Sequence, residues 1–210
     1  MRTRVKICGF TRVEDAVSAA TLGADAIGLV FYEGSPRFVE LQQARRIVAA
    51  LPAFVGVTGL FVNAEPAYVE QVLREVALDC LQFHGDESPE DCRRYGKPYI
   101  KAIRMRPELN YPEIEQSYQD ARGLLLDAYV PDGARGGTGG GFDWSLVPRL
   151  RTLPVILAGG LRADNAAAAI AAVHPHALDV SSGVEAAKGI KDPAKMAEFL
   201  SKTYQTIRIT

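Results

Sequence analysis

Short, strongly hydrophobic segments alternate with amphipathic segments from one end of the chain to the other. The hydrophobic segments are rich in β-branched residues and leucine. Several are apolar almost throughout, as strands are when a parallel sheet is covered on both faces. We therefore expect strands over Val5–Cys8, Ala26–Phe31, Phe54–Val62, Cys80–Phe83, Tyr99–Ile103, Gly123–Asp127, Pro154–Ala158 and Ala177–Val180.

The segments between the strands have the pattern of helices with one buried face. Apolar residues recur there at the i, i+3, i+4, i+7 spacing, most clearly in Val13–Ala20, Ala44–Leu51 and Val69–Val76. Pro112–Gln119 offers only one apolar pair, so we expect either a short helix or an irregular loop over that range.

Capping residues indicate where three of these helices begin. Thr11 and Glu14 have the spacing of a capping box. Ser88 and Asp192 each precede a proline, which places a capping side chain directly before the residue best suited to the first helical position.

The alternation of strand and helix predicts an α/β protein with eight strand-then-helix units. Because crossovers between parallel strands are right-handed, either a closed eight-stranded barrel or an open doubly wound sheet can accommodate them. The unbroken rhythm favours the (β/α)8 TIM barrel, although 210 residues are fewer than the ~250 typical of that fold. No shift in composition marks a boundary, so we predict a single domain over residues 1–210.

Charge and hydropathy narrow the classes of partner. Twenty-four basic residues against 25 acidic ones leave a formal charge of −1, and no basic block is present to neutralise the phosphates of a nucleic acid. The longest apolar runs, such as Ala26–Tyr32, are far shorter than the ~18 residues that span a bilayer. We expect neither a nucleic acid nor a membrane as partner.

The cysteines and the N-terminus indicate a reduced, cytoplasmic protein. Cys8, Cys80 and Cys92 are odd in number and lack Cys-x-x-Cys spacing, so neither a disulfide framework nor a zinc ribbon is predicted. The first residues are basic but lack the apolar region of a signal peptide.

In a barrel, functional side chains gather where the strands end, and Cys8 ends the first strand. Gly9 allows a sharp turn, and a helix follows whose positive N-terminal end would favour a thiolate. Alternation places Lys6 on the same face. The alternative is a buried structural cysteine, which is the commoner role of a strand cysteine and our interpretation of Cys80 and Cys92.

Asp127 ends the sixth strand, directly after three leucines. A carboxylate is costly in a dry core, so it must lie at the barrel mouth or be paired, unless it caps the following loop. If Cys8 and Asp127 face each other across the mouth, one can accept a proton while the other donates one.

The seventh and eighth strands end in small residues that suit a phosphate site. Gly159 and Gly160 follow the seventh strand, and Ser182 and Gly183 follow the eighth. Backbone N–H groups can approach an anion there, and a short helix beginning near Ser182 would add its positive end. Plain turns are the alternative. Gly136–Gly141 lacks the lysine of a Walker A loop and is interpreted as a flap over the substrate or a solvent linker.

Two further side chains are candidates for contact with substrate. Arg37 follows Ser35-Pro36, which restricts the loop, and a held guanidinium suits bidentate capture of a carboxylate or phosphate. An exposed surface arginine is the alternative. His84 either contacts substrate or is a hydrogen-bonded loop residue. No cluster of His, Asp and Glu has metal-ligand spacing, so no metal is expected.

Together these segments resemble the phosphoribosylanthranilate isomerases, barrel enzymes of tryptophan biosynthesis. The matching segments cover nearly the whole chain, with Phe83 standing where the family usually has leucine. They are Lys6–Gly9, Gly28–Phe31, Ser35–Arg37, Leu60–Asn63, Gln82–Gly85, Leu124–Asp127, Gly136–Gly139, Phe142–Trp144, Leu157–Leu161, Asp179–Glu185 and Gly189–Asp192.

The resemblance implies an Amadori rearrangement of N-(5-phosphoribosyl)anthranilate to 1-(2-carboxyphenylamino)-1-deoxyribulose 5-phosphate. It requires no cofactor, and the family is often monomeric. The residues implied are Cys8 as general base, Asp127 as general acid, Arg37, His84 and Asp179 in substrate binding, and Gly159, Gly160, Ser182 and Gly183 in phosphate binding.

Two alternatives remain at this point. Another phosphosugar barrel enzyme would show either catalytic lysine and glutamate at strand ends, as in indoleglycerol-phosphate synthase, or a metal-binding set, as in ribulose-phosphate epimerase. A non-catalytic phosphosugar-binding module would need the phosphate loops but neither Cys8 nor Asp127.

Overall fold

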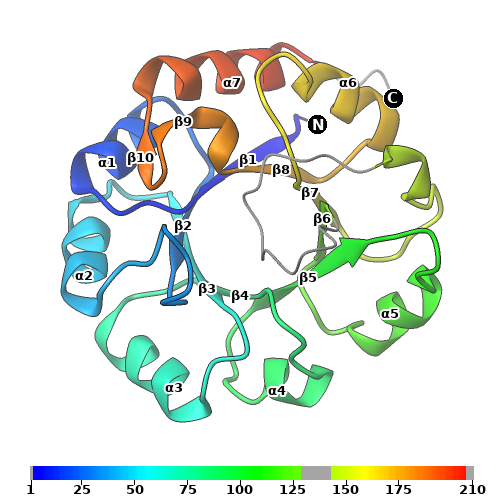
Figure 1. Ribbon diagram of the computed structural model, residues 1–210, viewed down its shortest axis with the longest axis horizontal. Coiled ribbons are helices and arrows are strands. Elements are labelled where there is room, and N and C mark those ends of the chain that lie inside the picture. Colours follow the sequence, from blue (N-terminus) through cyan, green and yellow to red (C-terminus); the bar gives the residue numbers. More distant parts are fainter. Residues whose placement is uncertain (1, 129–142, 207–210) are drawn as a thin grey trace.

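Eight parallel strands close into a barrel that a ring of helices surrounds (Figure 1). This computed structural model describes residues 2–128 and 143–206. Each strand pairs with the next one in the chain, and the last pairs with the first, which confirms the barrel and excludes the open sheet. The strands are β1 (Arg4–Cys8), β2 (Ala26–Val30), β3 (Gly56–Phe61), β4 (Cys80–Phe83), β5 (Tyr99–Met105), β6 (Leu124–Ala128), β7 (Val155–Leu157) and β8 (Ala177–Val180).

The helices follow the predicted positions. They are α1 (Val13–Thr21), α2 (Leu41–Ala50), α3 (Pro66–Glu75), α4 (Pro89–Arg93), α5 (Tyr111–Ser117), α6 (Ala166–Val173) and α7 (Pro193–Gln205). The weak fifth helix therefore forms. Within residues 143–154, the described part of the sixth unit between β6 and β7, the short 3₁₀ helix η1 (Trp144–Leu146) is present. No helix in the described ranges is long and apolar enough to cross a membrane.

One of the three predicted caps is wrong. Ser88 and Asp192 do accept hydrogen bonds from the first backbone N–H groups of α4 and α7. Arg12, however, stands at the cap of α1, and no side chain caps that helix. The hydroxyl of Thr11 instead donates to the carbonyl of Gly189, in the loop after β8, at 2.6 Å.

That loop after β8 contains structure that the hydrophobic pattern does not reveal. The 3₁₀ helix η2 (Ser182–Val184) is followed by a small antiparallel ribbon of β9 (Glu185–Ala187) and β10 (Ile190–Lys191). The start of η2 at Ser182 agrees with the prediction from the sequence, whereas the sequence does not predict the ribbon.

Side-chain alternation divides each strand between the barrel interior and the helix layer. Ile100, Leu125 and Ile156 belong to one apolar cluster that fills the interior, while the outward residues pack with the helices in the main core. Two positions further along β6, the same inward face carries Asp127. The apolar plug thus gives way to buried polar groups at the carboxyl ends of the strands.

Candidate active site at the carboxyl ends of the strands

Cys8 lies on the inward face at the end of β1, where it is 5% exposed. Its strand-register partner is Gly28 on β2. A Cβ atom at Gly28 would lie 2.6 Å from the Cys8 Sγ and 3.1 Å from the Lys6 Nζ. Glycine at this position therefore makes room for both the thiol and the ammonium group.

The surroundings of Cys8 favour its thiol form over the thiolate. Burial raises the pKa of the Cys8 thiol, and the opposing effect of the nearby Lys6 ammonium is smaller. The net shift of this pKa is upward, because desolvation is the largest effect on it. Lys6 itself is held by Asp179 at 2.9 Å. Burial lowers the pKa of Lys6, but the Asp179 carboxylate and the Cys8 side chain together outweigh burial and raise it.

Asp127 belongs to a hydrogen-bonded chain that also contains His84 and Gln82. The His84 Nε2 lies 3.2 Å from the Asp127 Oδ2, and the Gln82 Nε2 lies 3.0 Å from the His84 Nδ1. With the amide donating to Nδ1, the ring proton is on Nε2 and points at the carboxylate. The other Asp127 oxygen, Oδ1, accepts from the Ala128 N–H at 2.8 Å. His84 is thus a partner of Asp127, as well as lying at the strand end as predicted.

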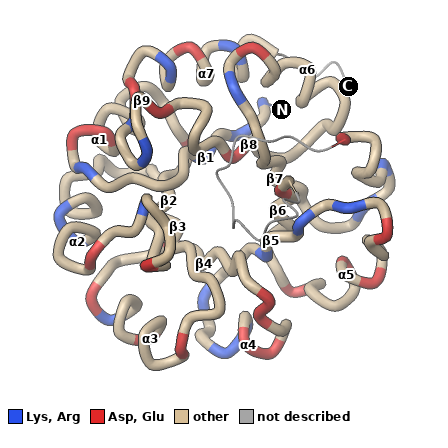
Figure 2. Tube along the Cα trace, in the orientation of Figure 1, with Lys and Arg blue, Asp and Glu red and all other residues tan. Residues whose placement is uncertain are grey.

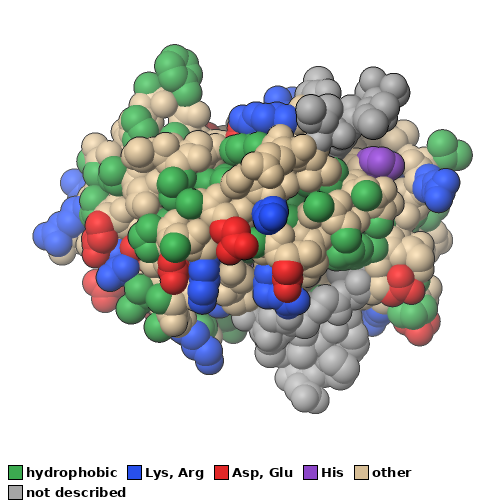
Figure 3. All heavy atoms as spheres, turned by 90° about the horizontal axis from the view of Figure 1, so that it is seen from above, with side chains coloured by type: hydrophobic (Ala, Val, Ile, Leu, Met, Phe, Trp, Pro, Cys, Tyr) green, Lys and Arg blue, Asp and Glu red, His purple; other side chains and the backbone are tan. Residues whose placement is uncertain are grey.

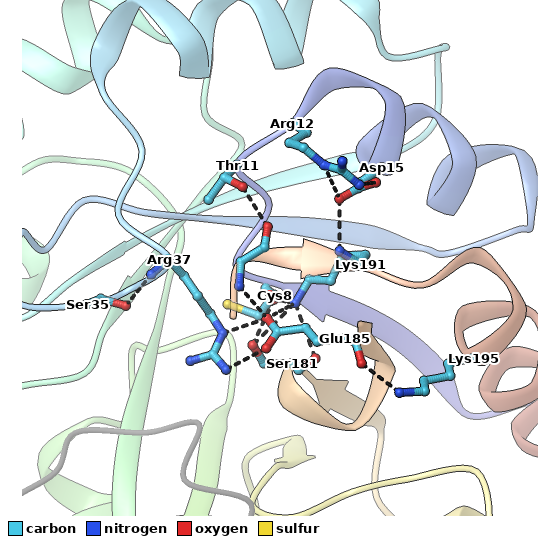
Figure 4. Close-up of polar contacts among 11 residues, drawn as sticks. Cys8, Thr11, Arg12, Asp15, Ser35, Arg37, Ser181, Glu185, Lys191 and Lys195 are labelled. Carbon is cyan, nitrogen blue, oxygen red and sulfur yellow. Dashed lines mark hydrogen bonds and ion pairs between the residues drawn. The ribbon is translucent and has the colours of Figure 1, made fainter. Parts of the chain in front are cut away.

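Arg37 is held by a carboxylate of the protein (Figure 4). Its Nε and Nη2 donate to the two Glu185 oxygens at 2.7 and 2.8 Å. Arg37 is only 7% exposed, so the alternative of a surface arginine is wrong. The guanidinium is held as predicted, but its first bidentate partner is Glu185, at the start of the unpredicted ribbon.

The two predicted phosphate loops lie against each other. Gly159 and Gly160 have φ values of 80° and 63°, a left-handed conformation that favours glycine. A Cβ atom at Gly183 would collide with the carbonyl oxygen of Leu161, so the loop after β8 packs directly on the loop after β7. The Asn165 amide donates to the carbonyl of Gly160 at 3.0 Å and holds that turn.

The sequence alone does not predict several residues that lie at the site. Gln82, Glu185 and Lys191 lie inside the matched segments, but their partners come from distant strands and loops. Arg104 is the strand-register partner of Asp127, and its Nη2 is buried with no hydrogen-bond partner in the described part of the chain. The predicted flap, Gly136–Gly141, lies outside the described residues. Within those residues, no group of three or more His, Cys, Asp and Glu could hold a metal.

Comparisons with known proteins identify the family to which the chain belongs. Residues 5–202 match the family described as N-(5'phosphoribosyl)anthranilate (PRA) isomerase. An N-(5'-phosphoribosyl)anthranilate isomerase of Pseudomonas putida is 58% identical over 202 residues, covering 96% of this chain and 98% of the relative. The chain belongs to this isomerase family. The Azotobacter vinelandii member is 60% identical over 197 residues, covering 94% and 95% of the two chains.

Solved structures of phosphoribosylanthranilate isomerases have the same fold. The Thermotoga maritima isomerase has a TM-score of 0.85 at 40% identity, covering 96% of this chain and 98% of that one. A second structure, in complex with reduced 1-(o-carboxyphenylamino)-1-deoxyribulose 5-phosphate, has a TM-score of 0.83 at 39% identity, covering 98% and 100%. Membership of this family confirms an isomerase of tryptophan biosynthesis, and excludes both other barrel enzymes and a non-catalytic module.

Proposed function

We propose that the chain converts N-(5-phosphoribosyl)anthranilate to 1-(2-carboxyphenylamino)-1-deoxyribulose 5-phosphate, with Cys8 as general base and Asp127 as general acid. The observation that carries this assignment is the pairing of each group with its own partner at the same end of the barrel. Cys8 has Lys6 beside it, and Asp127 has His84. Two proton-carrying groups in different environments are what an acid–base isomerisation requires.

Asp127 would act first by protonating the ribose ring oxygen. The C1–O bond then breaks, and the nitrogen lone pair forms a protonated Schiff base at C1. His84 suits this step, because its Nε2–H would stabilise the carboxylate that remains after the proton has left. The bond from the Ala128 N–H to Oδ1 restricts the rotation of the carboxyl group.

Cys8 would then remove the proton from C2. The electron pair of the broken C–H bond forms a C1–C2 double bond, and the π pair of the C1–nitrogen double bond moves to the nitrogen, which gives a neutral enolamine. Loss of the enol O–H proton and protonation at C1 complete the ketone. The Lys6 ammonium favours the thiolate that must form for this step, against the effect of burial.

The protein has groups that suit both the phosphate end and the carboxylate end of the substrate. Gly159, Gly160, Ser182 and Gly183 lie in two loops in direct contact, where backbone N–H groups can bind phosphate. Arg37 would bind the anthranilate carboxylate. Substrate contact by His84 would occur beside Asp127. Asp179 would use its Oδ2 for a sugar hydroxyl, since its Oδ1 accepts from Lys6.

We also propose a single-domain monomer that works in the cytoplasm without a cofactor. The three cysteines are free, as expected in a reducing compartment. Large exposed hydrophobic side chains come from separate segments, and charges of both signs mix on the face in Figure 3. Among the described residues, these exposed hydrophobic side chains are Leu22, Phe54, Leu150 and Ile190. One solved structure describes the Thermotoga maritima isomerase as dimeric, so the molar mass of this chain by light scattering is the deciding measurement.

The reaction is tested by turnover of N-(5-phosphoribosyl)anthranilate, followed by the loss of its anthranilate fluorescence. We expect turnover by the purified wild-type chain without added metal or nucleotide. Binding of the ribulose phosphate product without any turnover would contradict the proposed function.

A further inference from the structure

A buried chain of charged side chains connects Arg37 to the strand that carries Cys8 (Figure 4). Glu185 accepts from Arg37 through both oxygens, at 2.7 and 2.8 Å. The Lys191 Nζ donates to the same Glu185 Oε1 at 2.9 Å. The three side chains come from three different segments, and each is less than 10% exposed.

Lys191 continues the chain to the backbone of the site. Its Nζ donates to the carbonyl oxygen of Cys8 at 2.6 Å and to that of Ser181 at 3.2 Å. The side chain of Lys191 is wholly buried, and each of these acceptors compensates part of its desolvation. Lys191 therefore ties Glu185 to the ends of both β1 and β8.

The stem of Arg37 is held as closely as its guanidinium. A Cβ atom at Gly9 would lie 2.5 Å from the Arg37 Cδ, so the arginine packs directly on the glycine that follows Cys8. The Arg37 N–H donates to the Ser35 Oγ at 3.1 Å, which ties the loop to itself. Both ends of the side chain are thus located relative to β1.

The contact with Glu185 uses one of the two edges that a guanidinium can present to a carboxylate. Nε and Nη2 form the occupied edge, and Nη1 with the second Nη2 hydrogen forms the other. A ligand carboxylate can take only this second edge while the ion pair lasts. The direction of the second edge is therefore set by Glu185.

We propose that Glu185 and Lys191 are positioning residues, which aim the free edge of Arg37 at the ligand carboxylate and hold it in register with Cys8. This inference rests on the proposed function and deepens it. In this arrangement the aryl carboxylate is anchored to the same strand end that supplies the base. Neither residue touches the reacting atoms.

Charge balance decides which variant can test the idea. Removing Glu185 alone would leave two buried cations without a counter-ion, and that penalty can unfold the barrel. The double variant Glu185→Gln/Lys191→Met removes one charge of each sign and leaves the net charge of the cluster unchanged. A matched control is Glu87→Gln/Lys101→Met, which removes another buried pair, with a 2.9 Å contact, outside the Arg37 cluster.

The experiment measures the affinity of each variant for two ligands, the reduced product analogue and its counterpart without the carboxylate. We expect Glu185→Gln/Lys191→Met to weaken the carboxylated ligand by about 10-fold or more and the decarboxylated ligand by less than about 2-fold. The control pair should leave the ratio of the two affinities unchanged. Equal weakening of both ligands by the double variant would overturn the proposal.

A double-mutant cycle with Arg37→Ala provides a second readout that a purely structural role would not move. If Glu185 acts through Arg37, its loss costs no further selectivity once Arg37 is absent. Additive losses of selectivity would overturn the proposal. If the double variant does not fold, Glu185→Asp keeps the charge but shortens the reach, and the same drop in the affinity ratio is expected. Absence of turnover in the wild type would instead count against the proposed function, since this inference predicts only the ratio.

Discussion

Two buried groups at the carboxyl ends of the strands differ in their immediate surroundings. Cys8 is a thiol whose pKa burial raises, whereas Asp127 receives hydrogen bonds from His84 and from the backbone. Sequence reasoning finds both groups, because each ends a strand whose inward face can be counted by alternation. It does not find the partner of Asp127 or the pKa of Cys8, because burial depends on the closed barrel.

Replacing Cys8 by serine should abolish nearly all turnover while the fold persists. A hydroxyl has almost the same shape as the thiol but is a far poorer base, and the phosphate loops are untouched. Fluorescence-monitored turnover and product binding are measured on the same preparation. A variant that kept more than a small fraction of the wild-type kcat would remove Cys8 from the role of base.

Asp127→Asn should lower kcat by at least ~10²-fold, within the range of a general acid–base residue. Asparagine keeps the size of the side chain but cannot deliver the proton that opens the ring. Steady-state kinetics separates kcat from KM. A higher KM with an unchanged kcat would make Asp127 a binding residue, and His84 would then be the first candidate for the general acid.

The Cys8 thiol should react with an alkylating reagent mainly at alkaline pH. Burial raises its pKa, so the thiolate fraction stays small at neutral pH and grows as pH rises. The variant Lys6→Met/Asp179→Asn removes a pKa-lowering cation and a weaker pKa-raising carboxylate. The alkylation profile should therefore move to higher pH.

Mass spectrometry of the Cys8 peptide gives this profile, with Cys8→Ser as the background control. Burial also raises the pKa of Cys80 to about 11 and that of Cys92 to about 12, so neither should contribute near neutral pH. A shift of the Cys8 profile to lower pH in the double variant would contradict the role given to Lys6.

At the scale of elements, hydrophobic runs predict the barrel strands, because a strand covered on both faces is apolar at nearly every position. The β9–β10 ribbon is missed for the same reason. Its strands, Glu185–Ala187 and Ile190–Lys191, are short and carry charged residues. Their stability comes from the contacts of Glu185 and Lys191 with other segments.

The pairing of β1 with β2 predicts a sharp difference between two glycine variants. Gly28→Ala places a Cβ atom 2.6 Å from the Cys8 Sγ, so the thiol must move and turnover should fall steeply. Overpacking of this kind typically costs about 1–3 kcal/mol of stability. Kinetics and chemical denaturation measure the two effects.

Gly56→Ala is the matched control on the neighbouring strand β3. There the nearest atom to the new Cβ lies at 3.6 Å, an ordinary van der Waals distance. This variant should keep both turnover and stability close to those of the wild type. Equal tolerance of the two variants would mean that the space beside Cys8 is not needed.

At the scale of the whole molecule, closure of the barrel assembles the site from the two ends of the chain. Lys6 meets Asp179, and Arg37 meets Glu185, across 173 and 148 positions of sequence. Figure 2 shows charged residues on β1 and β8, which lie side by side. Local pattern identifies the strand ends, but contacts at such separations follow from the pairing of β8 with β1.

Variants at the carboxylate anchor and at the phosphate loops should change the affinities for two classes of ligand in different ways. Arg37→Ala should weaken ligands that carry the anthranilate carboxylate by roughly 2–3 kcal/mol, because a partly desolvated guanidinium–carboxylate pair is lost. Simple ribulose phosphate analogues should bind nearly as before. Gly183→Asp should weaken both ligand classes, since its Cβ collides with the Leu161 carbonyl and its charge repels phosphate.

Titration of both variants with the product analogue and its decarboxylated counterpart separates the two anchors. Equal weakening of the two ligands by Arg37→Ala would mean that Arg37 holds phosphate or the loop itself. The carboxylate would then need another cation at the mouth. Arg104 would be the first candidate, because it pairs in register with Asp127 and its Nη2 is buried without a partner among the described residues. Arg104→Gln should then reproduce the selective loss that Arg37→Ala failed to show.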